Sequence, residues 1–332
     1  MKIGLFVKKD ERAEAGKGEI RSILKKYKTD FASYEKLKNI DCDILVVLGD
    51  DSAILSAFMN IESEIPVLGV SMDGPHFLTE IEIRDFENYL KKILKNEYWM
   101  ERRIRLNVEV DGKKLPMALN EIALCNTKTG GLLRYSLKID NELVWRDSGD
   151  GVIVSTPTGS TGYGLSAGGP IIMENSGSIG IVPICSANMK KPLVVNETAV
   201  ISLYDIFSTT GSEIIIDGRY RYKIKDGKVC IKKSEKCASF IRFDKRVYLG
   251  LFGKLREKTE RLVLPKDAPP SAKFIYKLLE YEGSMTQKEI ISESSLPART
   301  VRHALTYLLD TGLMERHLTL RDTRQSVYTI KK

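Results

Sequence analysis

Short apolar runs alternate with amphipathic stretches along the first part of the chain. The apolar runs at residues 3–7, 44–48 and 67–70 are bounded by charged or turn residues, as is typical of buried parallel strands. Helix-like patterns lie between and after them, at residues 19–27, 53–59 and 85–95. The alternation predicts a doubly wound α/β nucleotide-binding domain over residues 1–100, with ligands at the carboxyl ends of its strands.

Beyond residue 100 the pattern becomes β-rich. We expect strands at residues 104–110, 117–124, 132–139, 152–154, 179–184, 194–203, 214–216 and 222–224. The dipeptides Asp111-Gly112 and Asp226-Gly227 separate such runs, as hairpin turns do. The pattern predicts a second, mostly β domain over residues 101–236.

Three prolines within residues 265–270 mark a linker at residues 261–270. Helical patterns at 272–281, 286–292 and 297–311 follow, and two β-like runs at 313–320 and 326–330 close the chain. Three helices and a hairpin resemble a winged helix-turn-helix domain, over residues 271–332. The expected outer face of its third helix and the tip of its hairpin provide the DNA-binding candidates, which are Arg299, Thr300, Arg302, His303, Arg321 and Arg324.

Composition narrows the class of protein. Of the 332 residues 42% are hydrophobic and 29% charged, a balance typical of a globular protein with a sizeable core. We expect a cytoplasmic protein without membrane contact, because no apolar run reaches about 18 residues and the chain starts without a signal-peptide segment. The five cysteines and three histidines are scattered, which argues against a disulfide framework and a zinc site.

The net charge of +8 invites a nucleic-acid interpretation. Nucleotide phosphates and nucleic acids are both favoured partners of such a chain, and charge alone does not choose between them. The excess of Lys and Arg over Asp and Glu is spread along the chain, so a solvated basic surface explains the net charge equally well.

The densest chemical signal lies at residues 150–170, with the sequence DGVIVSTPTGSTGYGLSAGGP. An apolar strand runs into a loop of glycines and hydroxyls around Tyr163. Backbone N–H and hydroxyl donors suit a ribose or phosphate, and an aromatic ring suits a base. The glycine spacing is that of neither a P-loop nor a Rossmann motif. A glycine-rich turn without a ligand is the alternative.

Residues 148–170 closely resemble the signature of the NAD kinase family, with Gly162 where alanine is usual. The resemblance covers residues 1–258 and includes the segments Phe77-Leu78-Thr79, Asn120-Glu121, Ile216-Asp217-Gly218-Arg219 and Phe252-Gly-Lys-Leu-Arg256. It implies an NAD-kinase-like α/β domain, to which residues 237–260 return, plus a β-sandwich-like domain. It further implies a homodimer or homotetramer that binds NAD and NADP.

The family phosphorylates the 2′-hydroxyl of the adenosine ribose of NAD, using ATP or polyphosphate with a divalent metal such as Mg²⁺. By position, Asp51 takes the place of the family's general base, while Asn120 and Glu121 would hold the adenosine ribose. Asp150 would contact the nicotinamide end, across a subunit interface in one arrangement. The adenine would be surrounded by Thr158, Thr161, Tyr163 and Ser166.

The phosphate-donor loop departs from the family pattern. Where the family has Gly-Gly-Asp-Gly, this chain has Gly49, Asp50, Asp51 and Ser52. A carboxylate about 4 Å from a phosphate costs about 1 kcal/mol at water-like screening and about 4 kcal/mol at an effective dielectric constant near 20. A metal bridging Asp50 to the phosphates would reverse the sign.

Two functions are therefore open. The first is an NAD kinase with an appended DNA-binding-like domain. The second is a transcriptional regulator that senses NAD, NADP or a related nucleotide and has little kinase activity. The altered loop favours the regulator, but the retained Asp51, Asn120 and Glu121 favour the kinase, because a sensor has less need of Asp51. For the C-terminal domain, DNA binding is the leading interpretation and protein contact the alternative.

Overall fold

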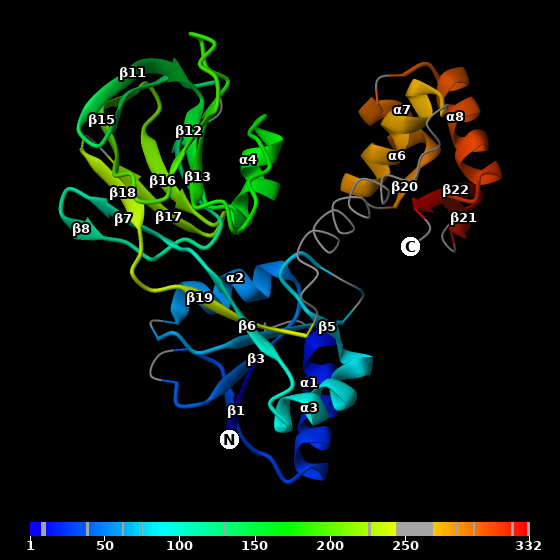
Figure 1. The fold of residues 1–332 in the computed structure, drawn as a ribbon. Coiled ribbons are helices and arrows are strands. Elements are labelled where there is room, and N and C mark those ends of the chain that lie inside the picture. Colours follow the sequence, from blue (N-terminus) through cyan, green and yellow to red (C-terminus); the bar gives the residue numbers. More distant parts are fainter. Residues whose placement is uncertain are drawn as a thin grey trace. The chain divides into compact units, whose positions relative to one another are not determined.

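The structure is a computed structural model (Figure 1). It describes residues 1–7, 11–37, 40–61, 63–72, 74, 76–128, 130–224, 227–243, 268–282, 284–294, 296–319 and 322–330, with backbone alone at 11–15, 277, 280–282, 317–319 and 322–325. The chain divides into two compact units, Met1–Val247 and Tyr248–Lys332, which are described separately.

The first unit contains a seven-stranded, mostly parallel sheet. Its strand order is β2-β1-β3-β4-β19-β6, and β5 pairs with β4. The strands are β1 (Lys2–Val7), β2 (Asp30–Tyr34), β3 (Ile44–Leu48), β4 (Val67–Ser71), β5 (Ile81–Glu82), β6 (Trp99–Arg103) and β19 (Ala238–Arg242). The apolar runs at β3 and β4 are fully buried, because helices cover both faces of the sheet.

The helices of this domain are α1 (Glu11–Lys26), α2 (Asp51–Asn60) and α3 (Phe86–Leu94), with a short 3₁₀ turn, η1 (Ile83–Asp85), before α3. Residues of α1 and α3 pack in one core cluster and those of α2 in another, on opposite sides of the sheet (Figure 1). The helix expected at residues 19–27 begins at Glu11, because its charged and glycine-containing first half has no apolar stripe to reveal it. Strands β2 and β19 were not anticipated.

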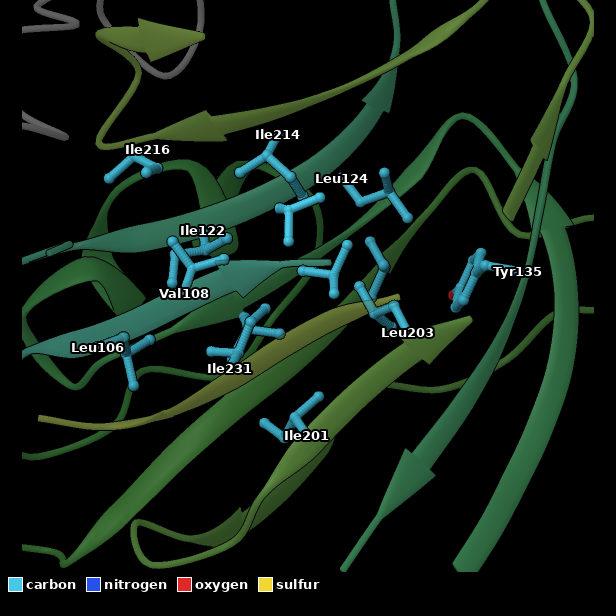
Figure 2. Packing of buried hydrophobic residues seen from close by; sticks show 14 of the residues in the cluster. Leu106, Val108, Ile122, Leu124, Tyr135, Ile201, Leu203, Ile214, Ile216 and Ile231 are labelled. Carbon is cyan, nitrogen blue, oxygen red and sulfur yellow. The ribbon is translucent and has the colours of Figure 1, made fainter. Parts of the chain in front are cut away.

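The rest of the first unit is a β-sandwich of two six-stranded sheets, β11-β10-β15-β18-β7-β8 and β14-β13-β12-β9-β16-β17. The strands are β7 (Leu106–Val110), β8 (Lys113–Lys114), β9 (Glu121–Asn126), β10 (Leu133–Ile139), β11 (Glu142–Gly149), β12 (Gly151–Ser155), β13 (Ser178–Ile184), β14 (Leu193–Asn196), β15 (Ile201–Ser208), β16 (Ser212–Ile216), β17 (Tyr220–Ile224) and β18 (Val229–Lys233). Figure 2 shows their core, where Val108 and Leu203 of one sheet share a cluster with Leu124 and Ile214 of the other.

Several expected strands differ from the observed ones. The run at 194–203 is two strands, β14 and β15, in different sheets, because the Asn196 side chain accepts the Thr198 N–H at 2.9 Å and turns the chain. The run expected at 104–110 begins as a strand only at Leu106, in β7, and β6 of the first sheet, which ends at Arg103 just before it, was not anticipated. Strands β11 and β18 were not anticipated. The glycine-rich loop contains a 3₁₀ turn, η2 (Thr158–Thr161), and a short helix, α4 (Tyr163–Ser166).

The second unit contains three helices and a small antiparallel sheet of order β20-β22-β21. The elements are α6 (Pro270–Glu282), β20 (Met285–Thr286), α7 (Gln287–Ser294), α8 (Ala298–Asp310), β21 (Met314–Thr319) and β22 (Asp322–Ile330). Thr286 and Glu289 form a capping box at α7, since the Thr286 N–H donates to Glu289 Oε2 at 2.7 Å and the Glu289 N–H to Thr286 Oγ1 at 3.3 Å.

Three sequence-based expectations fall on residues that the structure does not describe. They are most of the linker (261–267), residues 244–260 of the returning segment, and the hairpin-tip candidates, Arg321 and the side chain of Arg324. Within the described part of the returning segment, β19 pairs with β4 and β6. None of the described helices is long and apolar enough to cross a membrane.

Candidate active site

The loop between β3 and α2 places two aspartates at the amino end of α2. Gly49 has φ +142°, a conformation that side-chain-bearing residues rarely adopt. Asp50 is the N-cap residue of α2, because its Oδ1 accepts the Ala53 N–H at 2.9 Å and the Ser52 hydroxyl at 2.7 Å. Asp50 and Ser52 stand where the resembled motif has glycine, and here they hold the first turn of the helix.

The Asp51 carboxylate is oriented by two backbone donors. The Leu78 N–H donates to Oδ1 at 2.7 Å, and the Phe77 N–H donates to Oδ2 at 3.1 Å. A carboxylate oxygen has two lone pairs, and each of these bonds uses one. The carboxylate is therefore held at a defined angle and retains the capacity to accept a substrate proton.

A buried arginine, which the sequence did not single out, fixes the other end of α2. Arg105 is 1% exposed and donates from Nη2 to the Phe58 carbonyl at 2.7 Å. That carbonyl belongs to the last turn of α2, whose carbonyls lack intrahelical partners. Burial lowers the pKa of Arg105 to about 10. Arg105 thus ties the helix that begins at Asp51 to the chain entering the β-sandwich.

Asp217, between β16 and β17, organises the second half of the site. Its Oδ2 accepts the Leu119 N–H at 2.9 Å, and its Oδ1 accepts the N–H groups of Asn120 and Glu121 at 2.8 and 3.1 Å. Burial raises the pKa of Asp217, although these three donors act in the opposite direction. The sequence marked Asp217 only as part of a turn motif; its structural role is to fix the backbone of Asn120 and Glu121.

Two oxygen atoms of this half lack a partner among the described residues. They are Asn120 Oδ1 and Glu121 Oε2, both buried. Buried polar atoms in native proteins are nearly always hydrogen-bonded. Two such oxygens on adjacent residues therefore suit a ligand that carries hydroxyl groups, such as a ribose.

Glu121 gives the protein a pH-dependent stability. Burial, with the nearby charge of Asp217, raises the pKa of Glu121 to about 8. The unfolded chain ionises this carboxyl near its ordinary pKa, so its neutral form favours folding at low pH and that contribution is lost as pH rises towards 8. We expect Glu121→Gln to match the parent protein in Tm at pH 5 and to exceed it by roughly 3 °C or more at pH 9. Thermal unfolding of both ligand-free proteins at pH 5 and pH 9 tests this. If the variant and the parent differed in Tm by the same amount at both pH values, the expectation would be contradicted.

The loop after β12 packs on the backbone of Asn120. The Thr156 N–H donates to the Asn120 carbonyl at 2.9 Å, and the Gly159 N–H donates to Thr156 Oγ1 at 3.1 Å. A Cβ atom on Gly159 would lie 2.1 Å from the Asn120 carbonyl oxygen. This close approach requires glycine at residue 159.

The remaining NAD-binding candidates fall into two groups. Tyr163 is 43% exposed, and its pKa is raised by burial and by the nearby Cys125, Asp150 and Cys185. Asp150 and Ser166 are exposed as well. Thr158 and Thr161 are instead buried, with their hydroxyls directed to protein acceptors, namely Glu174 Oε1 at 2.8 Å for Thr158 and the Thr158 carbonyl at 3.4 Å for Thr161.

The described residues around Asp50 and Asp51 form no preassembled metal site. In the part of the chain that the structure describes, no group of three or more His, Cys, Asp or Glu side chains is arranged to hold a metal ion. Asp50 and Asp51 supply carboxylate oxygens, of the kind Mg²⁺ prefers, but each is already engaged by the hydrogen bonds given above.

These features define a nucleotide-binding enzyme that joins an α/β domain to a β-sandwich. Residues 7–98 match the family model of the ATP-NAD kinase N-terminal domain, and residues 119–243 match that of the C-terminal domain. The NAD kinase of Methanothermobacter thermautotrophicus is 37% identical over 227 residues, which are 68% of this chain and 78% of that protein. The chain belongs to the NAD kinase family and is a transferase.

Other relatives agree with this assignment. The NAD kinase of Thermoplasma volcanium is 30% identical over 277 residues, which cover 80% of this chain and 100% of that protein. An NAD kinase from Archaeoglobus fulgidus, solved in complex with ATP, has a TM-score of 0.67 and 29% identity, covering 77% of this chain and 99% of that one. Yeast NADH kinase, solved with NADH, shares the fold with a TM-score of 0.70 and 19% identity over 77% of this chain and 87% of its own. The kinase interpretation of the sequence is confirmed.

Proposed function

We propose that this enzyme transfers the γ-phosphoryl group of ATP to the 2′-hydroxyl of the adenosine ribose of NAD, with Asp51 as the general base. The observation that carries the proposal is the Asp51 carboxylate, held by two backbone N–H groups, in the same unit as the unpaired oxygens of Asn120 and Glu121. The Archaeoglobus relative solved with ATP supports ATP, rather than polyphosphate, as the donor.

The reaction needs alignment more than it needs covalent chemistry. The ribose oxygen bonds to the γ-phosphorus, the bond from that phosphorus to the β–γ bridging oxygen breaks, and ADP leaves. The proton of the 2′-hydroxyl passes to Asp51. A divalent cation such as Mg²⁺ belongs to this proposal as part of the ATP substrate, where it would neutralise phosphate charge.

Incubation of the pure protein with NAD, ATP and Mg²⁺ tests the proposal directly. We expect NADP and ADP in equal amounts. Replacing ATP by polyphosphate in a parallel reaction tests the donor, and NADP formation with polyphosphate alone would overturn the choice of ATP.

Asp50 should weaken ATP binding through like charge. Its side chain is exposed, so water-like screening applies and the cost is about 1 kcal/mol, or about fivefold in affinity. We expect Asp50→Asn to lower KM for ATP by two- to fivefold, on the order of that cost, and to leave KM for NAD unchanged. Asparagine is the informative replacement because it keeps an oxygen to cap Ala53.

The control for Asp50 is Asp41→Asn, which removes an exposed carboxylate paired with Lys2. Its KM for ATP should equal that of the parent enzyme. A higher KM for ATP in Asp50→Asn would mean that Asp50 helps to bind the metal–phosphate complex, and the repulsion argument would be wrong.

Assembly and location form part of the same proposal. We expect a homodimer or homotetramer in which Asp150 meets the nicotinamide end of NAD, and light scattering of the purified protein measures its mass. No disulfide bond joins the cysteines, which all lie among the described residues and are Cys42, Cys125, Cys185, Cys230 and Cys237. Free thiols are typical of reducing compartments, which supports a cytoplasmic location.

A second function, DNA binding, is proposed for the second unit as a winged helix-turn-helix domain. In α8 one face is buried, through Val301, Ala304, Leu305 and Leu308. Arg299, Arg302 and His303 are exposed, and Thr300 is half-buried. A helix with a buried apolar face and cationic side chains elsewhere has the form of a recognition helix in the major groove.

Salt-dependent binding of duplex DNA tests this second function. If four to six Lys or Arg side chains contact phosphates, log K should fall against log salt with a slope of about −4 to −5. Arg299→Ala should cost roughly 1–3 kcal/mol at its preferred sequence if Arg299 contacts a guanine. Lys273→Ala, on α6, is the control and should bind as the parent protein does. Equal DNA retention by the parent and by an Arg299→Ala, Arg302→Ala double variant would favour a protein-contact role.

Nucleotide occupancy should modulate this DNA binding, because the sequence predicts only a short proline-containing linker, residues 261–270, between the nucleotide-binding domains and the three-helix domain. Thermodynamic linkage requires that DNA change the affinity for NAD or NADP by the same factor as the nucleotide changes the affinity for DNA. Titrations in both directions measure the two factors.

A further inference from the structure

Five charged side chains form one connected network between the two halves of the active site. Glu101 and Arg103 lie on β6, Arg242 lies on β19, Glu80 precedes β5, and Glu174 follows α4. Their side chains are 7–20% exposed. The sequence shows no pattern that marks them, since they come from four separate segments.

The network begins at the loop that holds Asp51. The Leu78 residue that donates its N–H to Asp51 accepts, at its carbonyl, a bond from Arg242 Nη1 at 3.3 Å. Arg242 also pairs with Glu80 at 3.1 Å and, through Nε, with Glu101 Oε2 at 2.7 Å. The position of the catalytic loop is therefore set by a guanidinium group on β19.

The network ends at η2 (Thr158–Thr161), which we call the NAD-binding turn because Thr158 and Thr161 are NAD-binding candidates. Arg103 Nη2 pairs with Glu101 Oε2 at 3.0 Å, and Arg103 Nη1 pairs with Glu174 Oε1 at 3.3 Å. The same Glu174 oxygen accepts the Thr158 hydroxyl at 2.8 Å. Since Thr158 is the first residue of η2, the chain of contacts joins that turn to the loop of Asp51.

Opposite charge and aromatic packing hold this network together. Burial acts to raise the pKa of Glu101, but Arg103 and Arg242 outweigh it and hold that pKa below its ordinary value. The guanidinium groups of Arg103 and Arg242 lie 4.9 and 4.7 Å from the ring centroid of Phe240, which in turn lies 4.8 Å from the ring of Phe58 in α2. Removing one partner would leave a buried charge without compensation.

We propose that Arg103 and Glu174 are positioning residues, which set the distance between the NAD-binding turn and Asp51. The proposal rests on the proposed function, in which Asp51 accepts the proton of a ribose bound in the β-sandwich. Neither residue needs to touch a substrate. Their effect is on alignment, and misplacement of reacting groups by about 1 Å costs up to about a hundredfold in rate.

Glu174→Gln is the central variant because its amide oxygen still accepts from Thr158 while the ion pair with Arg103 is lost. We expect kcat to fall by about tenfold and both KM values to change by less than about threefold, because alignment is disturbed and binding is kept. Arg103→Met should lower kcat at least as much, and Arg103→Lys, which keeps the charge, should recover part of the loss. If Arg103→Met does not fold, Arg103→Lys alone carries the comparison.

Two controls separate positioning from general stability. Glu87→Gln removes another paired carboxylate, on α3, and should leave kcat unchanged. Thr158→Val breaks the network at its last contact, so adding Glu174→Gln to it should lower kcat by less than about twofold. All rates are measured well below the Tm of each variant.

Wild-type kcat in both Glu174→Gln and Arg103→Lys would overturn the proposal while leaving the proposed function intact. An equal kcat loss from Glu174→Gln with and without Thr158→Val would also overturn it, since the effect would then not pass through the NAD-binding turn. Turnover that survives in Asp51→Asn would instead remove the base assignment, and with it the reason for positioning. The two failures thus have different signatures.

Discussion

Replacement of Asp51 by asparagine is expected to lower kcat by at least about two orders of magnitude, the usual scale of a lost general base. The amide cannot accept the ribose proton. Its NH₂ group would also face either the Phe77 or the Leu78 N–H, so one of the two bonds that orient the side chain would be lost. NAD should still bind, because the unpaired oxygens of Asn120 and Glu121 belong to the other half of the site.

Steady-state rates and calorimetric NAD binding together test this expectation. The matched control is Asp50→Asn, which removes the neighbouring carboxylate and should leave kcat close to that of the parent enzyme. Parent-level turnover in Asp51→Asn would contradict the base assignment. Loss of NAD binding in the same variant would mean that Asp51 shapes the substrate pocket rather than accepting a proton.

Replacement of Gly159 by alanine is expected to damage NAD binding severely. The added Cβ would lie 2.1 Å from the oxygen and 2.4 Å from the carbon of the Asn120 carbonyl, and backbone atoms cannot rotate away as a side chain can. Overpacking of this kind costs roughly 1–3 kcal/mol. Because relief requires Asn120 to move, we expect NAD affinity to fall by about ten- to a hundredfold, at about 1.4 kcal/mol per decade, with a lower Tm.

Gly162→Ala is the matched control for Gly159→Ala. At residue 162 the added Cβ would lie 3.2 Å from the Gly159 carbonyl oxygen, a much milder contact than the 2.1 Å at residue 159. Alanine is also the residue that the resembled family motif has at this position. NAD affinity should stay within about threefold of the parent value, since a few tenths of an ångström relieve the contact. Similar effects of the two substitutions would contradict the steric argument.

The local features of this protein follow from its sequence. Apolar runs identified β1, β3 and β4, and helical periodicity identified α2, α3 and α8. Such elements can be predicted because burial requires apolar residues at short, regular spacing along the chain. The strand at the start of residues 150–170 and the glycine-rich loop after it are equally local, although the sequence did not reveal η2 and α4 within that loop. The family motifs placed Asp51, Asn120, Glu121 and the glycine-rich turn in one candidate site without reference to any contact.

Other features were decided by tertiary structure alone. Asp217 lies 97 residues from Asn120, whose N–H it accepts. The family resemblance implied that residues 237–260 return to the first domain, but only the structure places β19 between β4 and β6. The ion pairs between Arg103, Glu101 and Arg242 and the raised pKa of Glu121 likewise arise from residues that meet only after folding. Hydrophobic periodicity records which residues are buried. It carries no information on which distant polar group satisfies a buried charge or N–H, and in this protein those long-range pairings place the two halves of the site.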